Sequence, residues 1–195
     1  MALEPTITDI EQLKDRPELA RLLAWNAGAI TGAKFDRNEL TIWVDRTGLR
    51  EACLTLKNDP QLQYNALSDI TCVDWYPKAP RFEVVYQLFS IPNKNYLRLK
   101  VKISGEDASL DSLVPIWSGA DFFEREVFDL FGVVFDGHPD LRRILMWDEF
   151  KDHPMRKDYV EPDDFEWEPT PHGDVLERAR RHYPAPARPA KEPAP

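Results

Sequence analysis

The stretch RFEVVYQLFSIPNKNYLRLKVKI, residues 81–103, decides the fold class. Its second half alternates between apolar and polar residues, which is typical of a strand with one buried face. The apolar set is Leu97, Leu99, Val101 and Ile103, and the polar set is Tyr96, Arg98, Lys100 and Lys102. The residues PNKN at 92–95 favour a turn. We therefore expect strands at 81–90 and 95–103 that pair as a hairpin.

The segments on either side extend this hairpin into an α+β pattern. Further strands are expected at 40–44 and 66–76, and helices at 8–25, 48–58 and 118–131. Pro17 marks a break or a second start in the first helical region, and Gly132 ends the last helix. Because the strands adjoin one another, we expect an antiparallel or mixed sheet of about four strands with helices packed on it. This α+β globular domain is expected over residues 1–135.

Composition and charge exclude several classes of function. The chain has 195 residues, 43% of them hydrophobic, and a formal net charge of −9. That charge argues against non-specific binding to nucleic acid or to an anionic membrane surface. No apolar run reaches the roughly 18 residues of a transmembrane helix, and the N-terminus does not have the pattern of a secretory signal. We expect a protein of the cytosol without a transmembrane segment.

The two cysteines, Cys53 and Cys72, are too few for an iron–sulfur cluster or a structural zinc site. Both lie in segments with an apolar pattern, and free cysteine is among the most buried residue types. We expect two buried thiols and no disulfide.

The C-terminal region has a different composition. Ten of the 17 prolines lie from Pro139 onward, and an acidic block at 161–177 is followed by a basic block at 178–191. So many prolines exclude a packed domain there. We expect an extended arm over residues 160–195, with a short helix around 174–182, and a disordered tail is the alternative.

The stretch DFFEREVFDLFG, residues 121–132, is too apolar for a helix with one buried side. On a helical projection its apolar residues spread over about 240°. Asp121, Arg125 and Asp129 fill the remaining sector, where we expect surface ion pairing. Glu124 and Glu126 fall inside apolar arcs and need donors, because an unpaired buried carboxylate is costly. The candidate donors downstream are Arg142, Arg143, Arg156 and Lys157.

Catalytic and metal sites fit these residues poorly. Carboxylate-bridged metal sites on helices use Glu-x-x-His pairs, which Glu126, Asp129 and His138 do not form. Glu124 and Glu126 point about 160° apart on a helix, so they cannot act on one substrate as acid and base. The sequence has no phosphate-binding glycine motif. His138 and His153 each precede a proline, and loop histidines of this kind more often brace the structure than take part in catalysis. The hypothesis that is left is a surface that recognises a partner protein.

Two blocks resemble the signature of the C subunit of the proton-pumping NADH:quinone oxidoreductase, respiratory complex I. The first is ERE-x-x-DLFGV-x-F-x-GHP-x-LRRIL at 124–145, and the second is HPMRKDY at 153–159. That family usually has glycine before the second His-Pro, where this chain has Asp152. The resemblance is strong over about 117–159, whereas over 35–116 only the strand pattern and aromatic spacing fit.

The resemblance implies a non-catalytic subunit of the peripheral arm, on the cytoplasmic side of the bacterial inner membrane. FMN and the iron–sulfur clusters would lie in partner subunits, and this chain would contact the quinone-cavity subunit and the subunits with the terminal clusters. The whole complex would transfer electrons from NADH to quinone and pump protons. Residues 136–159 would then form an interface region. The implied interface residues are Glu124, Arg125, Glu126, Asp129, His138, Pro139, Arg142, Arg143, His153, Pro154, Arg156, Lys157 and Asp158.

Two alternatives to this function stay open. Related hydrogenases and ferredoxin- or plastoquinone-linked complexes contain similar domains. A stand-alone protein-binding domain belongs to a different class, with no redox partner.

Overall fold

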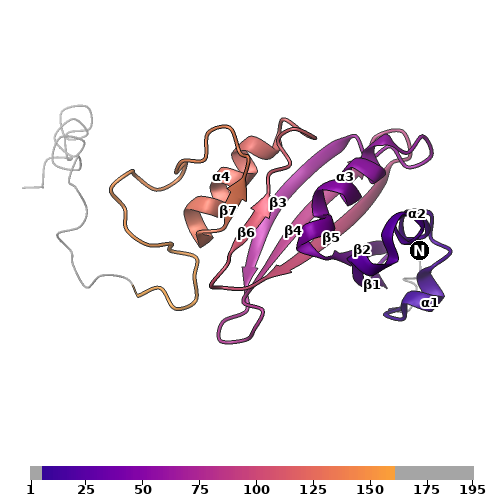
Figure 1. Ribbon diagram of the computed structural model, residues 1–195, viewed down its shortest axis with the longest axis horizontal. Helices are drawn as coiled ribbons and strands as arrows, with labels where there is room; N and C mark the ends of the chain where they lie inside the picture. Colours follow the sequence, from indigo (N-terminus) through magenta and orange to yellow (C-terminus); the bar gives the residue numbers. More distant parts are fainter. Residues whose placement is uncertain (1–5, 161–195) are drawn as a thin grey trace, which may run out of the picture. The chain divides into compact units, whose positions relative to one another are not determined.

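The predicted hairpin forms the centre of a five-stranded sheet in the computed structural model, which describes residues 6–160. The strands are β1 (Ile30–Asp36), β2 (Glu39–Val44), β3 (Ala66–Asp74), β4 (Phe82–Ser90) and β5 (Asn95–Ile103). Their order across the sheet is β1-β2-β5-β4-β3 (Figure 1). The β2–β5 pair is parallel and the other pairs are antiparallel, so the sheet is mixed.

The sheet has one strand more than expected, because the sequence pattern did not reveal β1. The pairing register of β1 with β2 shifts between Ile30 and Gly32. Such a bulge inserts a residue and breaks the alternation that identifies a strand. A second, two-stranded sheet was also not expected. Its parallel strands are β6 (Ser109–Asp111) and β7 (Val134–Asp136).

The helices lie close to their expected positions. They are α1 (Ile10–Leu13), α2 (Pro17–Asn26), α3 (Leu49–Asn58) and α4 (Ala120–Phe131), with short 3-10 turns η1 (Ala27–Ala29) and η2 (Arg46–Gly48). Pro17 occupies the first turn of α2, so it is the second start within the N-terminal region. That position suits proline, since its missing N–H would have no partner inside the helix.

The helices cover one face of the sheet (Figure 1). The four apolar residues of β5, at 97, 99, 101 and 103, are buried in one core with side chains from α2, α3 and α4. The opposite face of β5 is polar and half-buried or exposed, as its alternation predicted. Cys53 and Cys72 are buried free thiols. Burial raises the pKa of both thiols, that of Cys72 to about 12.

Within residues 6–160, no helix combines the length and the apolar character that crossing a membrane requires. The predicted arm beyond residue 160, including the helix expected around 174–182, lies outside the described residues.

Candidate subunit interface around helix α4

Helix α4 ends at Gly132, which has the left-handed backbone conformation with φ of 74°. Glycine adopts this conformation without steric cost, and its N–H donates to the carbonyl of Phe128 at 2.9 Å. A Cβ at this position would also collide with the side chains of Arg156 and His153. The glycine therefore ends the helix and leaves room for the loop that returns to it.

The second His-Pro block caps this end of α4. The carbonyls of residues 129–131 accept hydrogen bonds from His153 Nδ1, the Met155 amide and Arg156 Nε, at 2.9, 3.1 and 2.6 Å. Helix ends leave such carbonyls without partners, and cationic side chains near them are favourable. The predicted bracing role of His153 is thus observed, and the buried surroundings of its ring lower its pKa.

The residue before this block, Asp152, has φ of 67°. Aspartate tolerates the left-handed conformation better than most residues, which explains how it stands where the resembling family usually has glycine. Its carbonyl accepts a hydrogen bond from Arg143 Nη2 at 3.0 Å, so the turn is fixed to the loop in front of it.

Two of the three residues in the polar sector of α4, Arg125 and Asp129, face the protein rather than solvent, which corrects the expected surface ion pairing. Arg125 is buried and donates to the carbonyls of Arg142 and Arg143 at 3.2 and 3.1 Å. Asp129 has no exposed surface. The projection marked these residues as polar, but it did not show that a later segment covers them.

Asp129 holds the loop after the first His-Pro block. Its carboxylate accepts from Arg143 Nη1 at 2.6 Å and from the amides of residues 144–146 at 3.0, 2.7 and 2.8 Å. Burial alone would raise the pKa of Asp129, but these donors outweigh it and leave the pKa below its ordinary value. Asp129 is thus a buried carboxylate that its hydrogen-bond donors keep ionised.

Glu124 is also buried, but its donors are not the predicted arginines. Ser112 Oγ and the Leu113 amide donate to it at 2.7 and 2.6 Å. Burial raises the pKa of Glu124 to about 7, although these two hydrogen bonds oppose the shift. No lysine or arginine within residues 6–160 forms an ion pair with this carboxylate, and that difference separates it from Asp129.

His138 braces the first loop beside Glu124. Its ring is fully buried, with Nε2 at 3.2 Å from the carbonyl of Asp121, and Nδ1 accepts from the Asp140 amide at 3.0 Å. Because Nδ1 is an acceptor, the proton lies on Nε2 and is donated to that carbonyl. Nε2 is 3.5 Å from the Asp121 carboxylate and 4.0 Å from that of Glu124.

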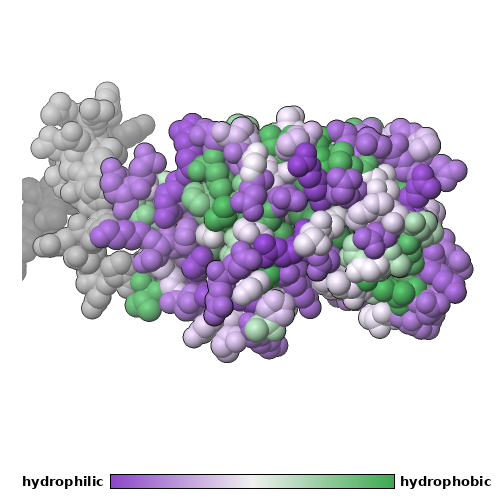
Figure 2. Space-filling view, in the orientation of Figure 1, coloured by the Kyte–Doolittle hydropathy of each residue, from purple (hydrophilic) through white to green (hydrophobic). Residues whose placement is uncertain are grey.

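Glu126 is exposed, so its expected burial beside Arg142 or Arg143 is wrong. Arg143 binds Asp129, and the exposed Arg142 pairs with Asp140 at 2.8 Å. The face of α4 that carries Glu126 also carries Phe122, which is 61% exposed. The exposed side of α4 is therefore partly apolar, and Figure 2 shows apolar surface over this helix.

The sequence analysis did not anticipate a clamp between the second block and the sheet. Arg81 donates to Asp74 at 2.8 Å and to Asp158 at 2.9 Å, and the Lys157 amide donates to Asp74 at 2.9 Å. Burial would raise the pKa of Asp74, yet its donors, Arg81 first among them, lower it to about 2. The sequence feature that could have indicated this clamp is the pair Asp74 and Arg81, an acid and an arginine at the two ends of the β3–β4 turn.

The predicted interface residues thus fall into two groups. The largely or partly buried ones, which hold the two loops on α4, are Glu124, Arg125, Asp129, His138, Arg143, His153 and Arg156. The exposed ones are Glu126, Pro139, Arg142, Lys157 and Asp158, and Pro154 is intermediate. Among the residues the structure describes, no three His, Cys, Asp or Glu side chains are grouped so that they could hold a metal ion.

Exposed apolar side chains accompany the two loops. They include Ile144, Leu145, Trp147 and Met155, between 37% and 59% exposed. The Trp147 ring packs edge-on against Phe150 at 4.8 Å between centroids. Apolar and aromatic residues on a fixed loop are the usual anchors of a protein interface.

Known proteins are similar to this chain over a range that includes α4 and the two loops. The family model described as respiratory-chain NADH dehydrogenase, 30 Kd subunit, matches residues 42–164. The C subunit of the NADH-quinone oxidoreductase of Geobacter sulfurreducens is 48% identical over 134 residues, which are 68% of this chain and 82% of that protein. The protein of the same name from Roseiflexus castenholzii is 43% identical over 140 residues, 72% of this chain and 80% of the relative.

Two solved structures are also similar. The first, described as Nqo5 of the trypsin-resistant fragment (1-134), has a TM-score of 0.55 and 32% identity and covers 64% of this chain and 99% of that one. A chain of a membrane-bound sulfane sulfur reductase, an archaeal respiratory membrane complex, has a TM-score of 0.60 and covers 90% of this chain and 95% of that one. At 22% identity the second likeness concerns the fold alone.

Proposed function

This chain belongs to the family of the respiratory-chain NADH dehydrogenase 30 Kd subunit, and we propose that it is the C subunit of an NADH-quinone oxidoreductase. In this role it is a structural subunit of the peripheral arm. The complex transfers electrons from NADH to quinone and couples this transfer to proton pumping. The chain itself supplies no catalytic residue.

One observation supports a structural role above the others. Arg125 and Asp129 bind backbone groups of residues 142–146, and Asp129 also pairs with the Arg143 side chain. These two side chains are not directed at a substrate, because their hydrogen-bond partners belong to the same chain. What they produce is a fixed loop with apolar side chains on its outside, and such a surface suits a neighbouring protein.

The proposed partners are other subunits of the peripheral arm, especially the quinone-cavity subunit and the subunits with the terminal clusters. FMN and the iron–sulfur clusters are assigned to those partners and not to this chain. The chain would be bound to the cytoplasmic side of the inner membrane through the complex. The exposed side chains of the two loops, including Leu145, would form part of the contact.

Purification of the tagged full chain from its native membrane in mild detergent tests this proposal. We expect it to co-purify with flavin, iron–sulfur clusters and NADH–quinone activity. Hydrogenase activity in the purified assembly would instead identify a related complex. Recovery of the chain alone would support an independent binding protein and overturn the proposal.

The interface residues need a test of their own, for which the chain offers a matched pair. Leu145 and Ile91 are 59% and 60% exposed. Leu145 lies on the loop after the first His-Pro block, whereas Ile91 directly follows strand β4. Leu145→Asp should lower the yield of assembled complex, because a desolvated carboxylate without a partner is costly. Ile91→Asp should assemble normally. Equal yields from both variants would place the interface elsewhere.

A further inference from the structure

The turn between β3 and β4 presents two neighbouring aromatic side chains to solvent. Trp75 is 40% exposed and Tyr76 is 47% exposed. Tryptophan and tyrosine are enriched in protein interfaces, where the large ring is buried while its polar atom finds a partner. The turn therefore offers two anchors for a neighbouring protein.

Hydrogen bonds within the turn hold these residues in place. The Trp75 amide donates to the Arg81 carbonyl at 2.7 Å, and the Lys78 amide donates to the Trp75 carbonyl at 2.9 Å. The Tyr76 amide donates to the Asp74 carboxylate at 2.9 Å. The Arg81 guanidinium, whose carbon is 5.1 Å from the centre of the Tyr76 ring, supports that ring. A partner would thus meet rings whose positions are set before binding, which lowers the entropy cost of association.

Two lysines accompany these rings. Lys78 lies in the turn itself, with its Nζ 5.8 Å from the centre of the Trp75 ring. Lys157 adjoins the turn, because its amide and that of Tyr76 donate to the two oxygens of one carboxylate, that of Asp74, at 2.9 Å each. Both lysines are exposed, and neither forms an ion pair within residues 6–160.

The neighbouring acids are already bound by an arginine. Arg81 donates to Asp74 at 2.8 Å and to Asp158 at 2.9 Å. Asp74 is also buried, so it does not reach the ammonium groups at the surface. The counter-charges for Lys78 and Lys157 therefore have to come from another molecule.

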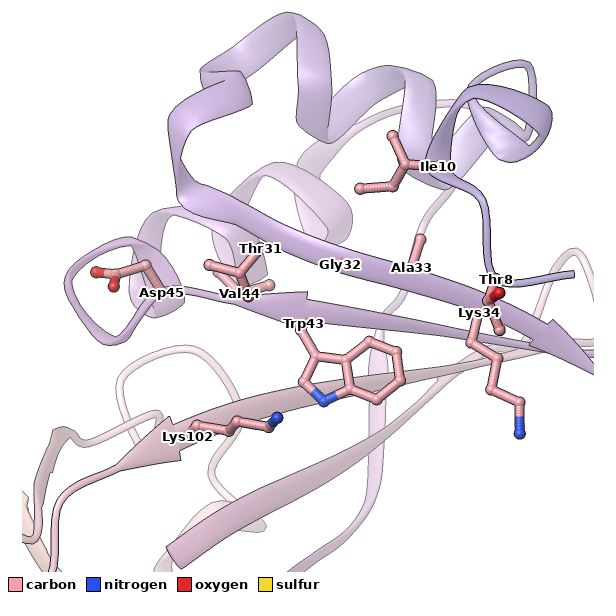
Figure 3. A pocket seen from close by; sticks show the side chains of 10 residues that line it. All are labelled: Thr8, Ile10, Thr31, Gly32, Ala33, Lys34, Trp43, Val44, Asp45 and Lys102. Atoms are coloured by element: carbon pink, nitrogen blue, oxygen red, sulfur yellow. The ribbon is translucent and has the colours of Figure 1, made fainter. Parts of the chain in front are cut away.

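A second surface with a tryptophan and lysines is different, because this chain supplies its carboxylates. It is a groove of about 680 Å³ along β1, with Trp43, Lys34 and Lys102 on one side (Figure 3). Trp43 Nε1 donates to Glu83 at 2.7 Å, and Lys102 stands opposite Glu83 in the strand register. Lys34 pairs with Asp36 at 2.7 Å. The β3–β4 turn has no such acids for its lysines among the described residues.

We propose that the β3–β4 turn and Lys157 bind an acidic segment of a neighbouring subunit. Its carboxylates would pair with Lys78 and Lys157, and an apolar residue beside them would pack on the rings of residues 75 and 76. The inference deepens the proposed function and rests on it, because the segment comes from another subunit of the complex.

A second copy of this chain and a lipid surface fit the turn less well. In a symmetric dimer the same surface faces itself, so Lys78 and Lys157 of one copy would meet the lysines of the other and repel them. The net charge of −9 opposes binding to an anionic lipid surface. An uncharged lipid surface offers the two lysines no carboxylate.

Amine labelling of the wild-type full chain, free and in the purified complex, tests the inference. Acetylation by an N-hydroxysuccinimide ester, followed by mass spectrometry, should modify Lys78 and Lys157 several-fold more slowly in the complex, because the partner covers them. Lys94 is the control, since this exposed lysine lies in the β4–β5 turn and should react equally in both states. A carbodiimide, which joins a lysine amine directly to a carboxylate in contact with it, then identifies the partner. We expect Lys78 or Lys157 to be linked to an aspartate or glutamate of another subunit.

Charge reversal provides an independent measurement. Lys78→Glu should weaken assembly at least about tenfold, because it places a carboxylate against the acidic segment. Lys78→Arg keeps the charge and should assemble normally, as should Lys94→Glu in the other hairpin turn. Equal yields from Lys78→Glu and Lys94→Glu would contradict the inference. The labelling experiments use the wild type, so a folding defect of Lys78→Glu would not affect them.

The possible outcomes separate the two proposals. If the wild-type chain purifies without partners, the proposed function fails and this inference falls with it. If the chain assembles but the two lysines react as fast as in the free chain, the inference alone is overturned. A cross-link to a second copy, protection that is lost when detergent removes the lipid, or protection without a link to a carboxylate of another subunit would each show a different occupant and overturn it as well.

Discussion

The two halves of α4 treat a buried carboxylate in opposite ways. Glu124 and Asp129 both have no exposed surface, yet the pKa of Glu124 is raised to about 7 and that of Asp129 is lowered. Glu124 has one amide and one hydroxyl as donors, whereas Asp129 has three amides and the Arg143 guanidinium. Burial therefore does not decide the ionisation state, and the number and charge of the donors do.

This difference also separates two structural roles. Asp129 fixes the loop after the first His-Pro block, which contributes exposed apolar side chains to the proposed interface. Glu124 joins α4 to the chain just after β6, through a hydroxyl and an amide at Ser112 and Leu113 and without a cationic partner among the described residues. Loss of the first carboxylate should therefore be far more damaging than neutralisation of the second.

The largest expected effect comes from Asp129→Ala. This change leaves the Arg143 cation and three amides without their acceptor, and losing one side of a buried ion pair costs about 3–5 kcal/mol. Urea denaturation of the free chain at pH 7 measures the change in the free energy of unfolding. A loss under about 1 kcal/mol would mean that the loop finds other acceptors, and the contrast between the two halves of α4 would be lost.

Gly132→Ala should cost less, but it acts on the same half of the helix. A left-handed backbone costs a non-glycine residue about 1–2 kcal/mol, and the new Cβ would also displace His153 and Arg156 from their carbonyls. Gly119→Ala is the matched control at the other end of α4, because its φ is −66° and its Cβ would meet nothing within 4 Å. Equal melting temperatures for the two variants would show that the second loop does not depend on this glycine.

Glu124→Gln should alter the pH dependence of stability more than stability itself. The folded pKa is about 7 against an ordinary value of 4.5, so between these values the unfolded chain releases the proton first. Wild-type stability therefore falls as pH rises through this window, by about 1.4 kcal/mol per pH unit from this group, and levels off above it. Glutamine has no proton to release, so the variant should lose this part of the slope.

Unfolding free energies of both proteins from pH 5 to pH 8 would measure the difference. Glu126→Gln, on the exposed face of the same helix, should retain the wild-type slope. Asp129 does not interfere, because its pKa is lowered and its contribution is lost only as the pH falls below its ordinary value of 3.8. Parallel curves for the wild type and Glu124→Gln would show that Glu124 is ionised in the folded chain, as Asp129 is.

The central part of the fold could be read from the sequence because its pattern is local. The alternation in β5 and the PNKN turn predicted the hairpin, and Gly132 predicted the end of α4, as the structure confirms. Strand β1 was missed because a bulge at Thr31 interrupts its alternation. Local periodicity detects a strand only where the register continues without a break.

The site was predicted less completely, because its geometry depends on contacts between distant segments. Helical projection indicated correctly that Glu124 is buried, but it placed Arg125 and Asp129 on the surface and Glu126 in the core. A projection has no information about a loop that returns 15 residues later and brings backbone donors to Asp129. The clamp between Asp74 and Lys157 spans 83 residues and has no periodic signal.

Glu126→Ala should have the smallest effect on the free chain, and it tests what the outer face of α4 does. Glu126 is exposed and lies on a helix, so we expect a change in unfolding free energy within about 0.5 kcal/mol. If this face meets a partner, the same variant should still lower the yield of assembled complex, because a carboxylate buried at an interface leaves its partner's donors unpaired when it is removed. Glu39→Ala is a suitable control, since this exposed residue lies on β2, away from α4. Normal assembly of Glu126→Ala would restrict the proposed interface to the two loops, whereas a stability loss near that of Asp129→Ala would show that both faces of α4 hold the fold together.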